Sequence, residues 1–129
     1  MLILSAFLGL VSLSQAAPAV LAPMEDVFIP MGFDDNDQTE VIVYGYLPDT
    51  CYERPKIKVK KTGKNIDIRV TTEKRVSFSP SFLCAQVTVP FLESVPLGKI
   101  DSGDYNIRVN RENPMHGING KLTVTEAQT

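Results

Sequence analysis

The chain has little of what most catalytic sites need. Its 129 residues include no tryptophan, two cysteines and a single histidine, His116. No G-x-S-x-G or C-x-x-C string occurs, and His116 stands in a turn-like stretch between Pro114 and Gly117. A Ser-His-acid triad would depend on this one imidazole as its base. We therefore predict that the protein is not an enzyme, that it has no catalytic residue, and that His116 is a solvated turn residue.

An excess of positive charge is also missing, because the formal net charge is −2 at pH 7. Domains that bind nucleic acid usually carry a marked basic excess. The charge balance therefore argues against nucleic acid as a partner.

No apolar run is long enough to span a bilayer, which requires about 20 residues. Residues 2–13 form an uncharged apolar run, followed by the small residues Ser14 and Ala16. These two stand at positions −3 and −1 of a cleavage site after Ala16, as in secretion signals. We predict a signal peptide over residues 1–16, a periplasmic or extracellular protein, and no membrane span after cleavage.

Cys51 and Cys84 are the only two cysteines in a chain predicted to be exported. Such a pair indicates one disulfide. The bond would link the loop after Tyr46 to the loop before Ala85 and would enclose a lysine-rich hairpin.

Helical periodicity is almost absent beyond residue 33, where apolar and polar residues alternate instead. Alternation of this kind is typical of half-buried strands, and Gly63 suits the turn of a hairpin between two of them. We predict an extended leader over residues 17–30 that ends in an edge strand, and an antiparallel β-sandwich of about seven strands over residues 31–129. The alternating segments are residues 39–46, 56–60, 65–70, 85–91, 105–110 and 121–125.

One motif narrows the class of sandwich. Asp101, Gly103 and Tyr105 fit the D-x-G-x-Y signature of the tyrosine corner in immunoglobulin-type domains, where the tyrosine hydroxyl bonds to upstream backbone. Ile107 stands where the second cysteine of the usual inter-sheet bridge would fall. We therefore predict an immunoglobulin-like sandwich whose disulfide lies elsewhere, with these three residues in a structural role.

The most acidic string contains Asp34, Asp35 and Asp37 around Asn36. Its oxygens are hard ligands of the kind that Ca²⁺ prefers, although the spacing is not that of an EF-hand. The alternative is a structural turn, because Asp and Asn side chains accept hydrogen bonds from nearby backbone. We predict no other cofactor, and we take this acidic loop as the first candidate for a ligand surface.

Two further segments have functional interpretations beside ordinary ones. Lys56, Lys58 and Lys60 share one face of a strand, which could bind phosphate-rich surfaces such as anionic lipid or lipopolysaccharide. Lysines on a strand also solvate it and discourage edge-to-edge pairing. Residues 78–81, Phe-Ser-Pro-Ser, have the composition of an exposed, rigid inhibitor loop or of an ordinary connection.

Three strings carry a resemblance: G-F-D-D-N-D at 32–37, G-Y-L-P-D-T-C-Y at 45–52, and S-G-D-Y-N-I-R-V-N at 102–110. They resemble a set of small, largely uncharacterised exported bacterial proteins over most of residues 27–125. The resemblance implies one β-sandwich domain and export, with no known activity. We predict an exported, non-enzymatic binding or structural protein whose partner is an unknown protein or envelope component. The alternatives are a calcium-dependent binding module that uses the acidic loop and a protease inhibitor.

Overall fold

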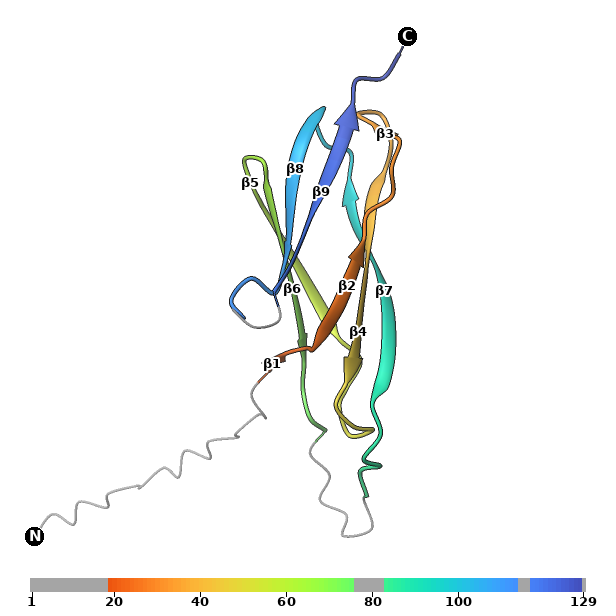
Figure 1. Ribbon diagram of the computed structural model, residues 1–129, viewed down its shortest axis with the longest axis vertical. Coiled ribbons are helices and arrows are strands. Elements are labelled where there is room, and N and C mark those ends of the chain that lie inside the picture. The colour runs from red at the N-terminus through yellow and green to blue at the C-terminus, as the bar shows by residue number, and fades with distance from the viewer. Residues whose placement is uncertain (1–18, 76–82, 114–116, 129) are drawn as a thin grey trace, which may run out of the picture.

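The computed structural model describes residues 19–75, 83–113 and 117–128, which form nine strands in two sheets and no helix (Figure 1). The larger sheet has the order β1-β6-β8-β9-β3, with β5 paired to β6, and the smaller has the order β2-β4-β7. This arrangement confirms the predicted all-β sandwich. The strands are β1 (Val20–Leu21), β2 (Met24–Phe28), β3 (Phe33–Asp34), β4 (Thr39–Leu47), β5 (Lys56–Thr62), β6 (Asn65–Thr72), β7 (Val89–Gly98), β8 (Gly103–Val109) and β9 (Ile118–Thr125).

Three sequence predictions lie outside the described residues: the signal peptide over 1–16, the loop at 78–81, and the turn at His116. The segment predicted as a leader is described from residue 19 onward, and it supplies β1 and β2. Val20 of β1 pairs with Thr72 in the larger sheet, whereas Val27 of β2 pairs with Val43 in the smaller. The chain before residue 31 therefore belongs to both sheets of the sandwich, and its strands raise the number above the seven expected.

The core lies between the two sheets and consists mainly of β-branched side chains. Burying each of these contributes roughly 1.5–3 kcal/mol relative to exposure. Their period-two spacing is the alternation visible in the sequence. The members of the hydrophobic cluster exposed by 2% or less are Val41, Val43, Ile66, Ile68, Val70, Val95, Tyr105, Ile107, Val109, Leu122 and Val124.

Two strand pairs are parallel, β3 with β9 and β6 with β8, although antiparallel pairing was expected throughout. The hairpin formed by β5 and β6 explains the second case. Ile66, Ile68 and Val70 of β6 are fully buried, whereas Val59 of β5 is 42% exposed. The more apolar arm takes the inner position beside β8 and leaves the lysine-rich arm outside. Because hairpin arms are antiparallel to each other, this choice makes β6 parallel to β8.

The strand predicted from Ala85 begins instead at Val89 and continues to Gly98. It contains Pro90, which the predicted strand already included, and Pro96, which lies beyond the predicted end of that strand. Proline is tolerated in an edge strand because its missing N–H can face away from the neighbouring strand. β7 is such an edge, next to β4 in the smaller sheet. The two prolines also limit the addition of a further strand there.

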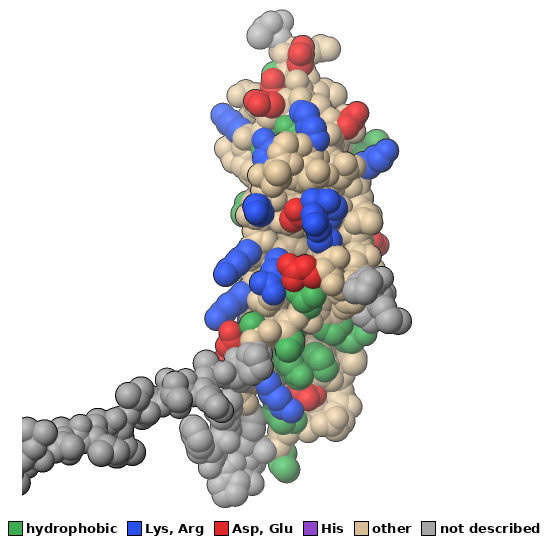
Figure 2. All heavy atoms as spheres, turned by 90° about the vertical axis from the view of Figure 1, so that its left-hand side faces the viewer, with side chains coloured by type: hydrophobic (Ala, Val, Ile, Leu, Met, Phe, Trp, Pro, Cys, Tyr) green, Lys and Arg blue, Asp and Glu red, His purple; other side chains and the backbone are tan. Residues whose placement is uncertain are grey.

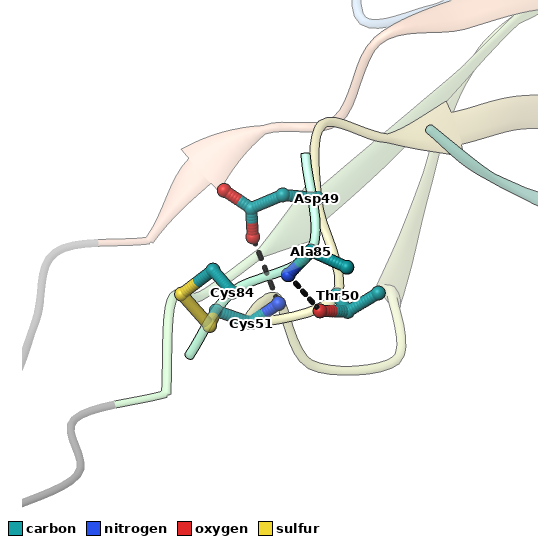
Figure 3. Close-up of a disulfide and its surroundings, with 5 residues drawn as sticks. All are labelled: Asp49, Thr50, Cys51, Cys84 and Ala85. Carbon is teal, nitrogen blue, oxygen red and sulfur yellow. Dashed lines mark hydrogen bonds between the residues drawn. A yellow bond between two sulfur atoms is a disulfide. The ribbon is translucent and has the colours of Figure 1, made fainter. Parts of the chain in front are cut away.

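Cys51 and Cys84 are bonded, with their Cα atoms 5.3 Å apart, which confirms the predicted disulfide. Figure 3 shows the hydrogen bonds around it. The Asp49 carboxylate accepts from the Cys51 N–H at 2.8 Å, and the Thr50 hydroxyl accepts from the Ala85 N–H at 2.9 Å. The disulfide and these bonds hold the β4–β5 loop against the segment before β7. A disulfide indicates an oxidising compartment outside the cytoplasm.

Tyr105 makes the hydrogen bond expected of a tyrosine corner. Its hydroxyl donates to the Asp101 carbonyl at 2.7 Å, and its ring is buried. The ammonium groups of Lys64 and Lys61 lie 4.5 and 5.4 Å from the centre of that ring. Cation–π contacts of this kind attach the tip of the β5–β6 hairpin to the turn before β8.

Asn110, directly after β8, has a role that the sequence analysis missed. Its side-chain oxygen accepts from the Val70 N–H at 2.7 Å, and its amide nitrogen donates to the carbonyls of Ala22 (3.0 Å) and Val70 (3.2 Å). Its backbone N–H donates to the Ile68 carbonyl at 2.8 Å. One buried amide therefore joins the first described segment, β6 and β8.

We expect Asn110→Gly to destabilise the fold by about 2–3 kcal/mol, because it leaves the buried Val70 N–H and Ala22 carbonyl without the side-chain amide. Glycine is the informative change, since residue 110 has a positive φ of 47° that glycine adopts without strain. Asn106→Ala, on the exposed side of β8, is the matched control and should shift stability by less than about 0.5 kcal/mol. Urea unfolding measures both changes. A glycine variant as stable as the unmodified protein would show that the amide contributes nothing.

Reduction of the disulfide should lower the free energy of unfolding by about 3–4 kcal/mol in the chain-entropy model, given the separation of 33 residues. Urea titrations with and without dithiothreitol measure the loss. A Cys51→Ala/Cys84→Ala variant should have the same free energy of unfolding as the reduced protein, and dithiothreitol should not change it. Non-reducing peptide mapping that finds two free thiols would contradict the assignment.

Candidate anion-binding face

The outer side of the larger sheet gathers much of the positive charge of the protein. Figure 2 shows lysines and arginines along this side. We call this surface the basic face. It is formed by outward-pointing residues of β5, β6, β8 and β9 and by the segment after β8. Its charged and amide members are Lys56, Lys58, Lys60, Asn65, Asp67, Arg69, Asp104, Asn106, Arg108, Arg111, Glu112, Asn119 and Lys121. The Asp104 carboxylate accepts a hydrogen bond from the Thr123 hydroxyl at 2.8 Å.

Strand register assembles this face. Lys58 lies opposite Arg69 and Lys60 opposite Asp67 across β5 and β6. The parallel pairing of β6 with β8 then places Asp67 opposite Arg108. The lysine stripe was predicted from β5 alone. The arginines were visible as outward positions of other strands, but alternation does not reveal which strands are neighbours.

Asp67 orients the arginines at the centre of the face. Arg108 binds its carboxylate through two hydrogen bonds of 2.7 and 2.8 Å, and Arg111 lies 3.7 Å from the same group. Bidentate pairs fix the plane of the guanidinium. Arg69 approaches Glu112 at 3.5 Å. The two carboxylates on this part of the face are therefore already engaged by three guanidinium groups.

Three lysines of the face keep their charge unneutralised. Within the described ranges, Lys58, Lys60 and Lys121 take part in no ion pair. Arg54, outside the face, is a contrast: its hydrogen bond to Glu93 at 2.9 Å, and their charge attraction, raise its pKa. These three lysines are available to an external anion, whereas Arg54 is paired within the fold and Lys56 lies 3.9 Å from the Glu73 carboxylate.

The face is hollowed rather than flat. One hollow of about 460 Å³ is lined by asparagine amides and by Arg108 and Lys121. A second, of about 490 Å³, is lined by Lys58, Lys60, Arg69, Arg111 and again Arg108. Because Arg108 borders both, the two hollows adjoin across its side chain. The amides of the first hollow belong to Asn65, Asn106 and Asn119.

The acidic loop has a different organisation. Asp34 accepts from the Asn36 N–H at 2.8 Å, Asp37 from the Asp34 N–H at 2.9 Å, and Asp35 from the Ala127 N–H at 2.8 Å. Each carboxylate thus accepts from a backbone N–H, and the bond from Asn36 to Asp34, two residues apart, is an Asx-turn. Among described residues, the only trio of metal-ligating side chains is Asp49, Cys51 and Cys84, whose sulfurs are bonded to each other. Calcium binding by the loop stays an untested alternative.

A family model described as the ORF11 beta-sandwich domain matches residues 41–124. The chain belongs to this family. No curated protein and no solved structure matches the chain. The matched part of this ORF11 domain begins in β4 and ends in β9, so it contains the basic face, the disulfide and the tyrosine corner. Membership of a β-sandwich family fits a structural or binding module. Among the described residues, no helix is long and apolar enough to cross a membrane.

We expect the melting temperature to be the same in calcium and in EDTA, because the three carboxylates of the acidic loop already serve as backbone caps. Differential scanning fluorimetry measures both. Asp37→Ala should lower the melting temperature equally in the two buffers, since it removes the acceptor of the Asp34 N–H. A melting temperature that rises with calcium would instead establish a metal site, because a ligand of the folded state stabilises it.

Proposed function

We propose that this ORF11 domain is an exported, non-enzymatic binding module that holds an anionic envelope component through its basic face. The observation that carries the proposal is the set of three unneutralised lysines, Lys58, Lys60 and Lys121, around hollows lined with oriented arginines. Export to the periplasm or the outside of the cell is supported by the disulfide and by the signal-like residues 1–16.

Charge segregation supports this proposal more than total charge does. The net charge is −2, yet the basic face combines seven lysines and arginines with three carboxylates, Asp67, Asp104 and Glu112. Other acidic residues gather at the acidic loop, at β2 and in the β4–β5 loop. A surface with an excess of one charge sign attracts oppositely charged ligands over about one Debye length, near 10 Å at moderate salt.

The sharpest test removes charge without removing bulk. We expect Lys58→Gln/Lys60→Gln/Lys121→Gln to weaken binding of anionic probes by about tenfold or more, because each exposed charge contributes modestly and the three add. Lys99→Gln, in the loop between β7 and β8, is the control with the same chemical change and should bind normally. The probes are polyphosphate, polygalacturonate and phosphatidylglycerol vesicles, measured by biolayer interferometry.

Binding should also fall steeply as salt is raised, since exposed charges are screened. If no anionic probe binds the unmodified protein at low salt, or if Lys99→Gln weakens binding as much as the triple variant, the proposed function is wrong.

A further inference from the structure

We infer that the anionic ligand is an acidic polysaccharide, whose hydroxyl groups bind in the amide-lined hollow while its acid groups meet the surrounding lysines. This inference rests on the proposed function and specifies its ligand class. It is argued from the first hollow, where three neutral amides stand among cationic side chains.

The three amides come together through strand register. Asn65 lies opposite Asn106 across β6 and β8, and Asn106 lies opposite Lys121 across β8 and β9. Asn119 lies opposite Arg108, which is the next outward-facing pair along β8 and β9. One row of amide, amide and cation therefore crosses the sheet, and the outward row beside it consists of the Asp67 carboxylate, the Arg108 guanidinium and the Asn119 amide. Inorganic anions need donors only, whereas a sugar presents hydroxyls that both donate and accept.

The amides can both donate and accept hydrogen bonds. The Asn106 amide nitrogen donates to the Asn65 oxygen at 3.3 Å. This contact uses one donor hydrogen and one acceptor site of the pair, whereas an amide has two of each. Both residues line the hollow. Asn119 is exposed beside them. The pattern of donors and acceptors beside Lys121 and Arg108 matches a hydroxylated ring that carries an acid group.

The cations are spread too far apart for a single small anion. Residues two apart on a strand are separated by about 7 Å, and neighbouring strands by about 4.8 Å. Lys58 and Lys60 on β5 are therefore about 7 Å apart at the backbone, and Lys121 lies across β6 and β8 from them. A ligand that meets all three lysines must be a chain with repeated acid groups.

Two other polyanions fit the face less well. A bilayer binds through apolar side chains that insert beside the charges, whereas the only large apolar side chain exposed on β5, β6, β8 and β9 is Val59. Single-stranded nucleic acid binds by stacking its bases on aromatic rings. The one aromatic residue of these four strands, Tyr105, is buried.

The experiment compares probes on the full chain with its disulfide intact, at one ionic strength. Polygalacturonate represents acidic polysaccharide, polyphosphate represents a linear anion without sugars, and phosphatidylglycerol vesicles represent membrane. We expect polygalacturonate to bind most tightly. Asn106→Ala/Asn119→Ala should weaken polygalacturonate binding about fivefold or more and leave polyphosphate binding unchanged. Asn36→Ala, an exposed asparagine of the acidic loop, is the matched control and should leave both unchanged.

The outcomes separate the two claims. If polyphosphate or vesicles bind as tightly as polygalacturonate, or if the double asparagine variant binds polygalacturonate normally while the triple lysine variant does not, the polysaccharide inference is wrong and the proposed function stands. If no probe binds, both are wrong. Melting temperatures establish that each variant is folded, and Asn119→Ser, a smaller change on exposed β9, replaces the double variant if that one unfolds.

Discussion

The parallel pairing of β6 with β8 is the contact on which both sides of the larger sheet depend. Its inner side brings Ile66 and Ile68 against the core beside Ile107. Its outer side brings Asp67 beside Arg108, which orients the guanidinium at the centre of the basic face. Beyond the last paired residues, the Asn110 amide continues the contact with hydrogen bonds to Val70. One register therefore sets the core and the candidate site together.

Local features of this fold could be predicted from sequence, and neighbour relations could not. The alternation of apolar and polar residues located most strands, and the D-x-G-x-Y string marked the turn at Tyr105. The disulfide could be assigned because the chain has only two cysteines. Which hairpin arm faces β8 depends on a comparison of burial between β5 and β6, and alternation is similar in both. For the same reason, Arg108 could be placed outward but not beside the lysines. The predicted strand ended before Pro96, because proline is excluded from central strands and alternation does not show that β7 lies at an edge of its sheet.

The strings that carried the resemblance turn out to include residues that shape the backbone. A Cβ at Gly45 would collide with the Pro23 carbonyl and the Phe91 ring. Asp49 caps the Cys51 N–H, and Asp37 caps the turn at Asp34. These positions maintain the ends of the sandwich. Most of the basic face lies outside the three strings, on outward positions where a side chain can change without disturbing the core. Membership of the ORF11 family therefore establishes the scaffold, whereas the choice of ligand depends on the outward residues.

Net charge is a poor guide to partners in a molecule built of two sheets. The value of −2 sums a basic face and an acidic remainder, and a ligand within a Debye length of one face responds mainly to that face. The stronger argument against single-stranded nucleic acid is chemical, because the outward positions of β5, β6, β8 and β9 carry amides, carboxylates and cations and no aromatic ring on which bases could stack. Amides beside cations favour a ligand that combines hydroxyl groups with repeated negative charge, which is the chemistry of an acidic sugar chain.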